Sequence, residues 1–379
     1  TNGWLWQNDK GVVSLGDVTV YDANGLELAA RMEIGEHYSR IIVDGEALAN
    51  ASYPVLIDPE VGTNDFRVST MGPDGSAGYT ADNPAIAYNS SLNEYLVVWE
   101  GDDDTLPLVD QEIEIFGQRI NAATGALVGS RIRISEMGPD GDTTYRANTP
   151  TVAYSSAEDE YLVCWSGDDD SAPKVNEELE IHCNYVVAAT GTTPFFPFIY
   201  SDMGTDGSIN YSAFNPDVTY NAINNEYLLV WEGSDNTGTL VASEFEIYGQ
   251  RILSTTGAEI GSNDFRISDM GNDGDADFDA LRPAVTHNTT DNEYLIVWAG
   301  ENQALSNEFE IYGQRIDGSS GTTLGTNELG DNDFRISDMG DDNSSAYSSF
   351  EPDVAYNTFN NEYLVVWEGE DNILPLVIG

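Results

Sequence analysis

The chain has 379 residues, with 66 Asp and Glu against 14 Lys and Arg, which gives a formal net charge of −52. This excess of negative charge argues against nucleic acid or an anionic membrane surface as a partner, and favours divalent cations or a salt-rich medium that screens the self-repulsion. No apolar run approaches the roughly 20 residues of a membrane-spanning helix, which predicts no membrane insertion. The chain starts at Thr1 without a signal sequence, which predicts a processed or trimmed product.

Residues 1–60 form the first predicted region, a β-rich segment or partial domain. The stretch at 18–45, VTVYDANGLELAARMEIGEHYSRIIVDG, alternates in the manner of a β-meander, and YPVLIDP at 53–59 closes it.

Residues 61–379 contain an internal repeat, whose clearest element is NEYLVVWEG at 93–101. Its tryptophan recurs every 66 to 69 residues, and a methionine followed by glycine lies 28 residues before each one. The tryptophans are Trp99, Trp165, Trp231, Trp298 and Trp367, and the methionines are Met71, Met137, Met203, Met270 and Met339. Because the spacing between Met and Trp never changes, this part of each repeat is predicted to be one packed unit.

Each repeat contains four short strand-like runs, in the first repeat PAIAYN, EYLVVWE, EIEIFGQRI and RIRIS. These runs are rich in β-branched and aromatic residues on both alternating faces, as in a strand packed between two neighbouring sheets. Four antiparallel strands repeated radially make the blade of a β-propeller. The sequence therefore predicts an all-β fold: a five-bladed propeller of four-stranded antiparallel blades over 61–379, preceded by the small N-terminal β region.

The two ends of the repeat region suggest how the ring closes. NDFRVS at 64–69 matches a fourth strand without a blade before it, and the last repeat contains only its first two strands. We therefore expect residues 64–69 to close the fifth blade. LPLV at 374–377 matches 106–109, which precede the third strand of the first repeat, so the fifth blade lacks that strand. Either the natural chain continues, or a neighbouring molecule supplies the strand and the protein self-assembles into a filament.

The second repeat holds both cysteines of the chain, Cys164 and Cys183, where the first repeat has Val98 and Gly117. Their joint appearance predicts a cross-strand disulfide and an oxidising compartment, and two buried thiols are the alternative.

Together, NEYLVVWEG, EIYGQRI and NDFRISDMG resemble the propeller-type repeats of large secreted or cell-surface proteins of bacteria and archaea. The resemblance covers nearly the whole chain and implies an extracellular or cell-surface location, with adhesion or surface structure as the function. It carries no catalytic residues.

Acidic residues gather in the links between the second and third strands and in the turns after each methionine. Calcium needs six to eight oxygen ligands, which two acidic loops on one face can supply together; solvated turns are the alternative. The predicted metal ligands are Asp74, Asp140, Asp206, Asp273 and Asp342 in the turns, and Asp102, Asp103, Asp168, Asp169, Asp235, Glu112, Glu178, Glu244 and Glu308 in the links.

An aromatic residue lies eight positions after each methionine, on the same predicted face. Stacked on a sugar ring, it would give a carbohydrate site in each blade; packing against its own loop is the more conservative interpretation. These residues are Tyr79, Tyr145, Tyr211, Phe278 and Tyr347. The repeated arginines of the third and fourth strands, which the second repeat replaces with Tyr185 and Ile199, are predicted to pair with carboxylates on adjacent strands.

The main functional prediction is a calcium-stabilised, non-catalytic surface module that binds carbohydrate or a surface protein. The alternative is a glycoside hydrolase or lyase, which needs carboxylates near the central channel. Asp217 and Asp353 follow the repeated proline at positions where the other repeats have Ala85, Thr151 and Ala284. The enzyme hypothesis requires these two and one Glu to converge on the channel at the distances of glycosidase carboxylates, and fails if they are scattered or pair only with arginines.

Overall fold

We describe the protein from a computed structural model. It describes residues 4–8, 11–24, 26–34, 39–53, 55–61, 66–72, 78–103, 105–169, 173–194, 197–301, 308–325, 333–339 and 347–369. The chain divides into two compact units, residues 1–68 and 69–379. No helix in the described part of the chain is long and apolar enough to span a membrane.

The first unit is built from short antiparallel strands and one short helix. Strands β1 (Trp4–Asn8), β2 (Gly11–Tyr21) and β5 (Leu56–Val61) form one sheet, and β3 (Ala30–Ile34) pairs with β4 (Ser39–Val43). Helix α1 (Gly45–Ala49) begins after Asp44, whose carboxylate accepts the N–H groups of Glu46 and Ala47 and so caps the helix.

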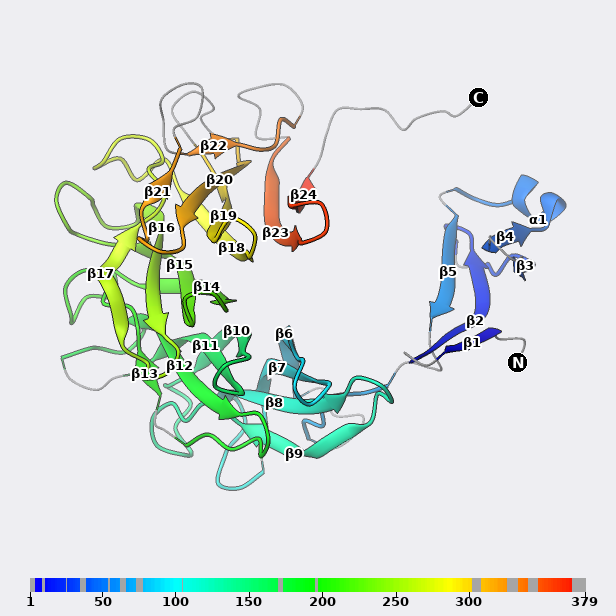
Figure 1. Ribbon diagram of the computed structural model, residues 1–379, viewed down its shortest axis with the longest axis horizontal. Helices are drawn as coiled ribbons and strands as arrows, with labels where there is room; N and C mark the ends of the chain where they lie inside the picture. The colour runs from blue at the N-terminus through cyan, green and yellow to red at the C-terminus, as the bar shows by residue number, and fades with distance from the viewer. Residues whose placement is uncertain are drawn as a thin grey trace. The chain divides into compact units, whose positions relative to one another are not determined.

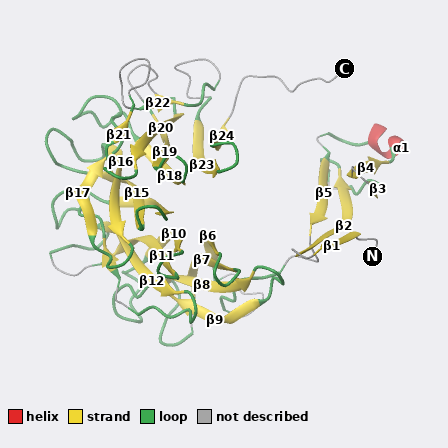
Figure 2. Cartoon of the chain, in the orientation of Figure 1, coloured by secondary structure: helices red, strands yellow, loops and turns green. Residues whose placement is uncertain are grey.

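The second unit consists of five antiparallel sheets in chain order (Figures 1 and 2), which we number sheets 1 to 5. Sheet 1 contains β6 (Ala81–Asn89), β7 (Glu94–Asp102), β8 (Ile113–Asn121) and β9 (Leu127–Arg133). Sheet 2 contains β10 (Ala147–Ser155), β11 (Glu160–Asp168), β12 (Leu179–Val187) and β13 (Phe198–Ile199). Sheet 3 contains β14 (Ala213–Asn221), β15 (Glu226–Ser234), β16 (Phe245–Leu253) and β17 (Glu259–Arg266).

Sheet 4 contains β18 (Ala280–Asn288), β19 (Glu293–Gly300), β20 (Glu310–Asp317), β21 (Thr323–Leu324) and β22 (Phe334–Arg335), and sheet 5 contains β23 (Ser349–Asn357) and β24 (Glu362–Gly369). The first strands β6, β10, β14, β18 and β23 lie innermost, and successive inner strands pack against one another. The expected all-β architecture of antiparallel, mostly four-stranded sheets is therefore confirmed.

The expected closure of the ring is not observed. In the described residues, 66–69 belong to no strand, and β23 and β24 pair only with each other. The predicted positions 64–65 and 374–377 lie outside those residues. Sheet 5 consequently buries less apolar surface, since Trp367 is 36% exposed whereas its equivalent in sheet 2, Trp165, is 0% exposed.

The constant spacing between Met and Trp reflects direct packing. The indole N–H of Trp165 points to the sulfur of Met137 at 3.4 Å, and the indole N–H of Trp231 points to that of Met203 at 3.4 Å. The methionine methyl group also reaches the glycine two residues after the tryptophan, such as Gly167, where a side chain would collide with it. The sheet interfaces are thus close-packed, and a change in spacing would separate these groups.

The repeated arginines pair with carboxylates on adjacent strands, as the sequence indicated. Arg119 lies 2.8 Å from Glu94, and the equivalent pair Arg251–Glu226 is also at 2.8 Å. In sheet 2, where Ile199 replaces the arginine of the last strand, Lys174 from the preceding link reaches the buried Glu180 at 3.0 Å. This lysine supplies the missing positive charge, since an unpaired buried carboxylate would be costly.

Candidate functional site

A cavity of about 530 Å³ lies where the five inner strands meet. Each strand contributes one triplet of residues with proline at its centre, which we call the channel triplets. The cavity is lined by Asn83-Pro84-Ala85, Thr149-Pro150-Thr151, Asn215-Pro216-Asp217, Arg282-Pro283-Ala284 and Glu351-Pro352-Asp353. Its volume is in the range of small-molecule sites, about 300–1,000 Å³.

Each channel triplet forms an irregularity in its strand. The pairing register shifts at this place in all five inner strands, and the residue before proline has a positive φ of 46° to 55°. Such a φ is unusual for residues other than glycine, and proline has no N–H to donate to the ladder. Glu100 and Glu232 stabilise the strained residue of the following sheet by accepting the backbone N–H groups of Thr149 and Arg282, each at 2.6 Å.

The channel triplets differ in sequence from one repeat to the next. The position before proline holds Asn, Thr, Asn, Arg and Glu, and the position after it holds Ala, Thr, Asp, Ala and Asp. The sequence drew attention to Asp217 and Asp353 but missed Arg282 and Glu351. The same departure from the repeat one residue before the proline could have revealed them.

Asp217 is the most strongly held of the channel carboxylates. It accepts hydrogen bonds from Thr151 Oγ1 of sheet 2 at 2.9 Å, from Val285 N of sheet 4 at 2.8 Å and from Val218 N of its own strand at 2.9 Å. Burial raises the pKa of Asp217 to about 6, against the effect of these hydrogen bonds, and the charge of Asp353 adds to the increase. This carboxyl group therefore holds a proton closer to neutral pH than an ordinary Asp does.

The other charged channel residues come from sheets 4 and 5. Arg282 forms an ion pair with Glu351. Asp353 is exposed, and its carboxylate accepts the N–H of Val354 at 2.8 Å. Asp217, Asp353 and Glu351 therefore line one cavity, as the alternative enzyme hypothesis requires, and Asp217 hydrogen-bonds to no arginine side chain in the described residues.

The acidic links use their carboxylates mainly as acceptors for backbone N–H groups. Glu112 accepts from Gly141 N at 2.9 Å, and Glu178 and Glu244 make the same contact with Gly207 and Gly274. Asp102 and Asp168 accept from the N–H groups of Gln111 and Glu177. The glutamate contacts tie three links to the turn that opens the next sheet, and the aspartate contacts close two of these links on themselves, a structural role that the sequence did not reveal.

The remaining predicted metal ligands are dispersed. Asp103, Asp140, Asp206 and Asp273 pair with Arg131, Arg133, Lys174 and Arg266, and Asp235 accepts from Gly204 N, Asn236 N and Thr237 Oγ1. Glu308 is buried, Asp169 is partly buried, and Asp74 and Asp342 lie outside the described residues. No group of three or more His, Cys, Asp or Glu side chains in the described part of the chain is arranged to hold a metal ion. Calcium binding stays a prediction, which thermal unfolding with calcium and then with chelator would test.

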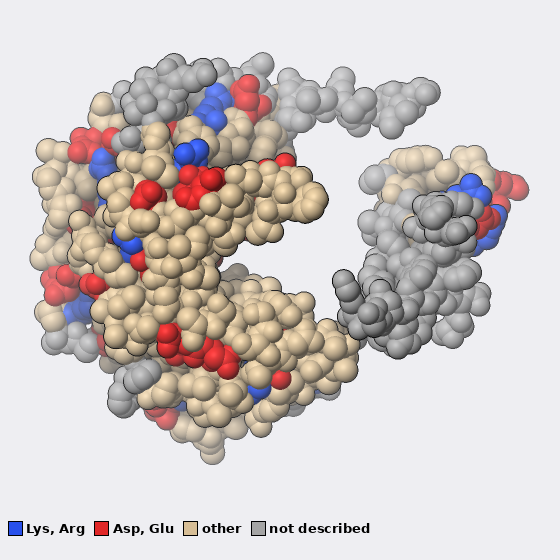
Figure 3. Space-filling model, viewed as in Figure 1, with Lys and Arg blue, Asp and Glu red and all other residues tan. Residues whose placement is uncertain are grey.

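Acidic side chains form separate patches on the face of the second unit drawn in Figure 3, several with basic side chains beside them. The aromatic residues predicted to stack on sugars instead cover the glycine that follows each methionine. Tyr79 lies over Gly72, Tyr145 over Gly138, Tyr211 over Gly204 and Phe278 over Gly271, whose positive φ values a larger residue would strain. Tyr347 is partly buried, and the glycine after Met339 lies outside the described residues.

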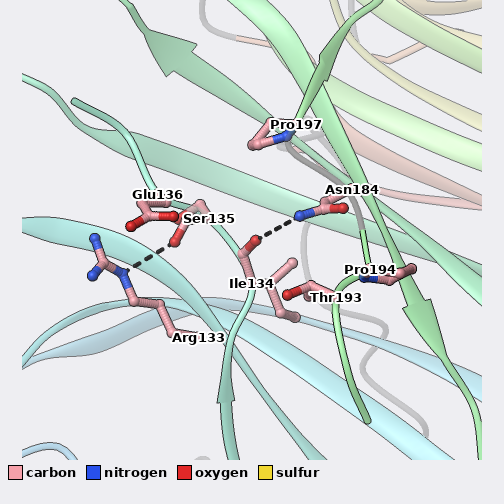
Figure 4. A pocket seen from close by; sticks show the side chains of 8 residues that line it. All are labelled: Arg133, Ile134, Ser135, Glu136, Asn184, Thr193, Pro194 and Pro197. Carbon is pink, nitrogen blue, oxygen red and sulfur yellow. Dashed lines mark hydrogen bonds between the residues drawn. The ribbon is translucent and has the colours of Figure 1, made fainter. Parts of the chain in front are cut away.

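Sheet 2 contains a disulfide and lies beside a second cavity. Cys164 and Cys183 face each other on β11 and β12 and form a disulfide. Beside this sheet lies a second cavity, of about 290 Å³, lined by Arg133, Ser135, Asn184 and Pro194 among others (Figure 4). Asn184 donates to Ile134 O at 3.1 Å and Arg133 to Ser135 O at 3.1 Å, so both polar side chains already support the fold.

Comparison with known proteins adds solved structures only, since no protein-family model and no curated protein matches the chain. A GH43_12 retrieved from a capybara gut metagenome is 12% identical with a TM-score of 0.41, over 76% of this chain and 47% of that one, so this chain spans about half of that structure's length. A thermostable family-43 glycoside hydrolase is 12% identical with a TM-score of 0.42, over 79% and 87% of the two chains. The α-L-arabinanase of Penicillium chrysogenum is 12% identical with a TM-score of 0.45, over 76% and 74%.

These structures correct the expectation of a non-catalytic surface module. The three solved structures given above are named as glycoside hydrolases and an arabinanase, and none of the three is named as an adhesion or filament module. At these identities and TM-scores the likeness itself assigns no reaction to this chain. The reaction has to be argued from the residues of the channel.

Proposed function

We propose that the protein is a glycoside hydrolase whose active site is the cavity of the channel triplets. The observation that supports this most directly is that charged side chains found in only some of the repeats meet in one cavity. A scaffold or an array of equal binding sites would keep its repeats alike there, whereas an enzyme needs a unique set of side chains at one place.

The two aspartates of the channel fit the two roles of glycoside hydrolysis. One carboxyl group must give a proton to the leaving oxygen, and the other must activate water or attack the sugar. Asp217, with its pKa raised to about 6, suits the proton donor. Asp353, exposed in the same cavity, suits the second role.

The charges of the cavity bear on the substrate. Three carboxylates, those of Asp217, Glu351 and Asp353, accompany one basic side chain, that of Arg282. A negatively charged cavity disfavours acidic sugars, so we expect a neutral glycoside. The α-L-arabinofuranosidase and β-1,3-galactosidase named among the similar structures suggest which sugars to try first.

The decisive variant is Asp353→Asn. Its carboxylate accepts the N–H of Val354 in its own strand, a bond that an amide oxygen can also accept, so the fold should tolerate the change. Wild-type protein is assayed on 4-nitrophenyl α-L-arabinofuranoside, 4-nitrophenyl β-D-galactoside and arabinan. We expect hydrolysis by the wild type and a loss of at least about 100-fold in the variant.

The matched control is Asp338→Asn, because the side chain of Asp338 is 81% exposed and does not line the channel. It should keep wild-type activity. The proposal fails if the wild type hydrolyses none of these substrates, or if Asp353→Asn is as active as the control.

A further inference from the structure

Another cavity, of about 550 Å³, lies at sheet 3, and none of its lining residues belongs to a channel triplet. Its lining comes from the link after β15, from β16 and β17, and from the turns that precede sheets 3 and 4. The polar lining includes Asp202, Asp235, Tyr248, Asp264, Arg266 and Asp273. Arg266 already pairs with Asp273 at 2.7 Å, so the other aspartates dominate the remaining charge.

Two buried acceptors of this cavity lack a partner. Tyr248 is only 2% exposed, and neither its Oη nor Oδ1 of Asp264 has a hydrogen-bond partner among the residues that the structure describes. Burying such atoms without a partner costs free energy, so a ligand that donates hydrogen bonds to them would be stabilised. Asp264 also has a φ of 44°, a strained value for a residue other than glycine.

Sheet 1 shows what the equivalent space can hold. There Arg131 occupies the position of Asp264. Arg131 precedes Ser135 in sheet 1 by the same number of residues as Asp264 precedes the equivalent Ser268 in sheet 3. Its guanidinium group pairs with Asp103 and donates to the carbonyl oxygen of Thr70. It also lies 4.8 Å above the ring of Phe116.

The residues around Arg131 in sheet 1 have equivalents in the lining of the sheet 3 cavity. Asp103 is equivalent to Asp235, Phe116 to Tyr248 and Thr70 to Asp202. Sheet 3 therefore keeps the carboxylate and the aromatic ring that hold a guanidinium in sheet 1. It replaces the arginine itself with an aspartate.

We propose that the cavity of sheet 3 binds an organic cation through a planar guanidinium group, as a free small molecule or as an arginine side chain of another protein. The ligand would donate to the carboxylates of Asp235 and Asp264 and lie over the Tyr248 ring as Arg131 lies over Phe116. This site is separate from the proposed active site and does not depend on the hydrolase activity.

The titration of Asp264 agrees with this inference. Burial raises its pKa to about 7, and the charges of Glu180, Asp202 and Glu259 add to the increase against the hydrogen bond from Asp202 N. A bound cation would compensate this concentration of negative charge.

The test is a titration of the whole 379-residue chain with methylguanidinium at pH 8, in which isothermal calorimetry or NMR detects binding. Tetramethylammonium, which has the same charge but no N–H group, is the control ligand. We expect saturable binding of methylguanidinium and at least about tenfold weaker binding to the Asp235→Asn variant. A peptide with one arginine distinguishes the two sources: tighter binding than methylguanidinium indicates a protein partner, and equal binding indicates a free small cation.

Two further variants use sheet 1 as the internal reference. Asp264→Arg should fill the cavity and abolish binding, and Arg131→Ala should lower the melting temperature and regain part of it when methylguanidinium is added. The proposal is overturned if methylguanidinium gives no saturable signal, if tetramethylammonium binds equally well, or if Asp235→Asn leaves the affinity unchanged.

Discussion

At the scale of single residues, Glu160 shows what one replaced arginine does to a carboxylate. Its counterparts Glu94 and Glu226 pair with Arg119 and Arg251, but sheet 2 has Tyr185 at the arginine position. Burial raises the pKa of Glu160 to about 7, and the charge of Glu158 adds to the increase. Because the folded state holds this proton more tightly than the unfolded chain, the contribution of Glu160 to stability falls as the pH rises from about 4.5 to 7.

We therefore expect Glu160→Gln to stabilise the protein at pH 8. At pH 4 it should have no effect, because the carboxyl group of the wild type is then mostly protonated and neutral like the amide of the variant. One unit of pKa shift corresponds to about 1.4 kcal/mol, and partial exposure screens the effect, so the expected gain in the free energy of unfolding is about 1–2 kcal/mol. Urea unfolding at the two pH values measures it. The control, Glu94→Gln, removes a paired carboxylate and should destabilise at pH 8; a destabilised Glu160→Gln would contradict the argument.

At the scale of elements, the disulfide of sheet 2 joins adjacent strands at positions that sheet 1 fills with Val98 and Gly117. The double variant Cys164→Val, Cys183→Gly therefore introduces the two residues that face each other at the same positions of sheet 1. With a sequence separation of 19 between the cysteines, loss of the cross-link should lower the free energy of unfolding by about 3 kcal/mol through the entropy of the unfolded chain. Wild-type protein in reducing agent should show the same loss in urea unfolding, and an unchanged midpoint would show that the bond does not restrict the unfolded chain.

The sequence predicted the elements well where the repeat is constant. The Met–Trp spacing indicated a packed unit, and the structure shows the indole N–H of Trp165 directed at the sulfur of Met137. Contacts between consecutive repeats were not predictable from spacing. Lys174, which comes from a link, takes the role of an arginine that other repeats have on the fourth strand, and Glu178 accepts the N–H of a glycine in the next turn. Both contacts depend on how the loops fold back in three dimensions.

The candidate site was predicted only in part for a similar reason. Asp217 and Asp353 stood out as departures after a repeated proline, but their convergence follows from the arrangement of five strands around one cavity. The cavity of sheet 3 was hidden further, since it arises from an arginine that is absent there and present in sheet 1. Closure of the ring, inferred from matching ends of the repeat region, is the expectation that the described residues do not bear out.

At the scale of the whole molecule, the net charge of −52 should dominate the response to salt. Raising NaCl from about 0.02 M to 1 M shortens the Debye length to about 3 Å, which screens the repulsion between carboxylates. We expect the melting temperature to rise steadily over this range. KCl at equal ionic strength should act alike, whereas a rise that only millimolar calcium produces would indicate specific ion binding in place of screening.

The channel triplets have a consequence for how this molecule can change. Ten residues, two from each inner strand, line one cavity, while the proline between them is the same in all five strands. Recognition is thereby separated from architecture, much as an antibody separates its hypervariable loops from its framework. New specificities can therefore arise by exchanging single side chains. A library randomised at the five positions before the proline would sample them, whereas the positions after it include the buried Thr151 and Ala284.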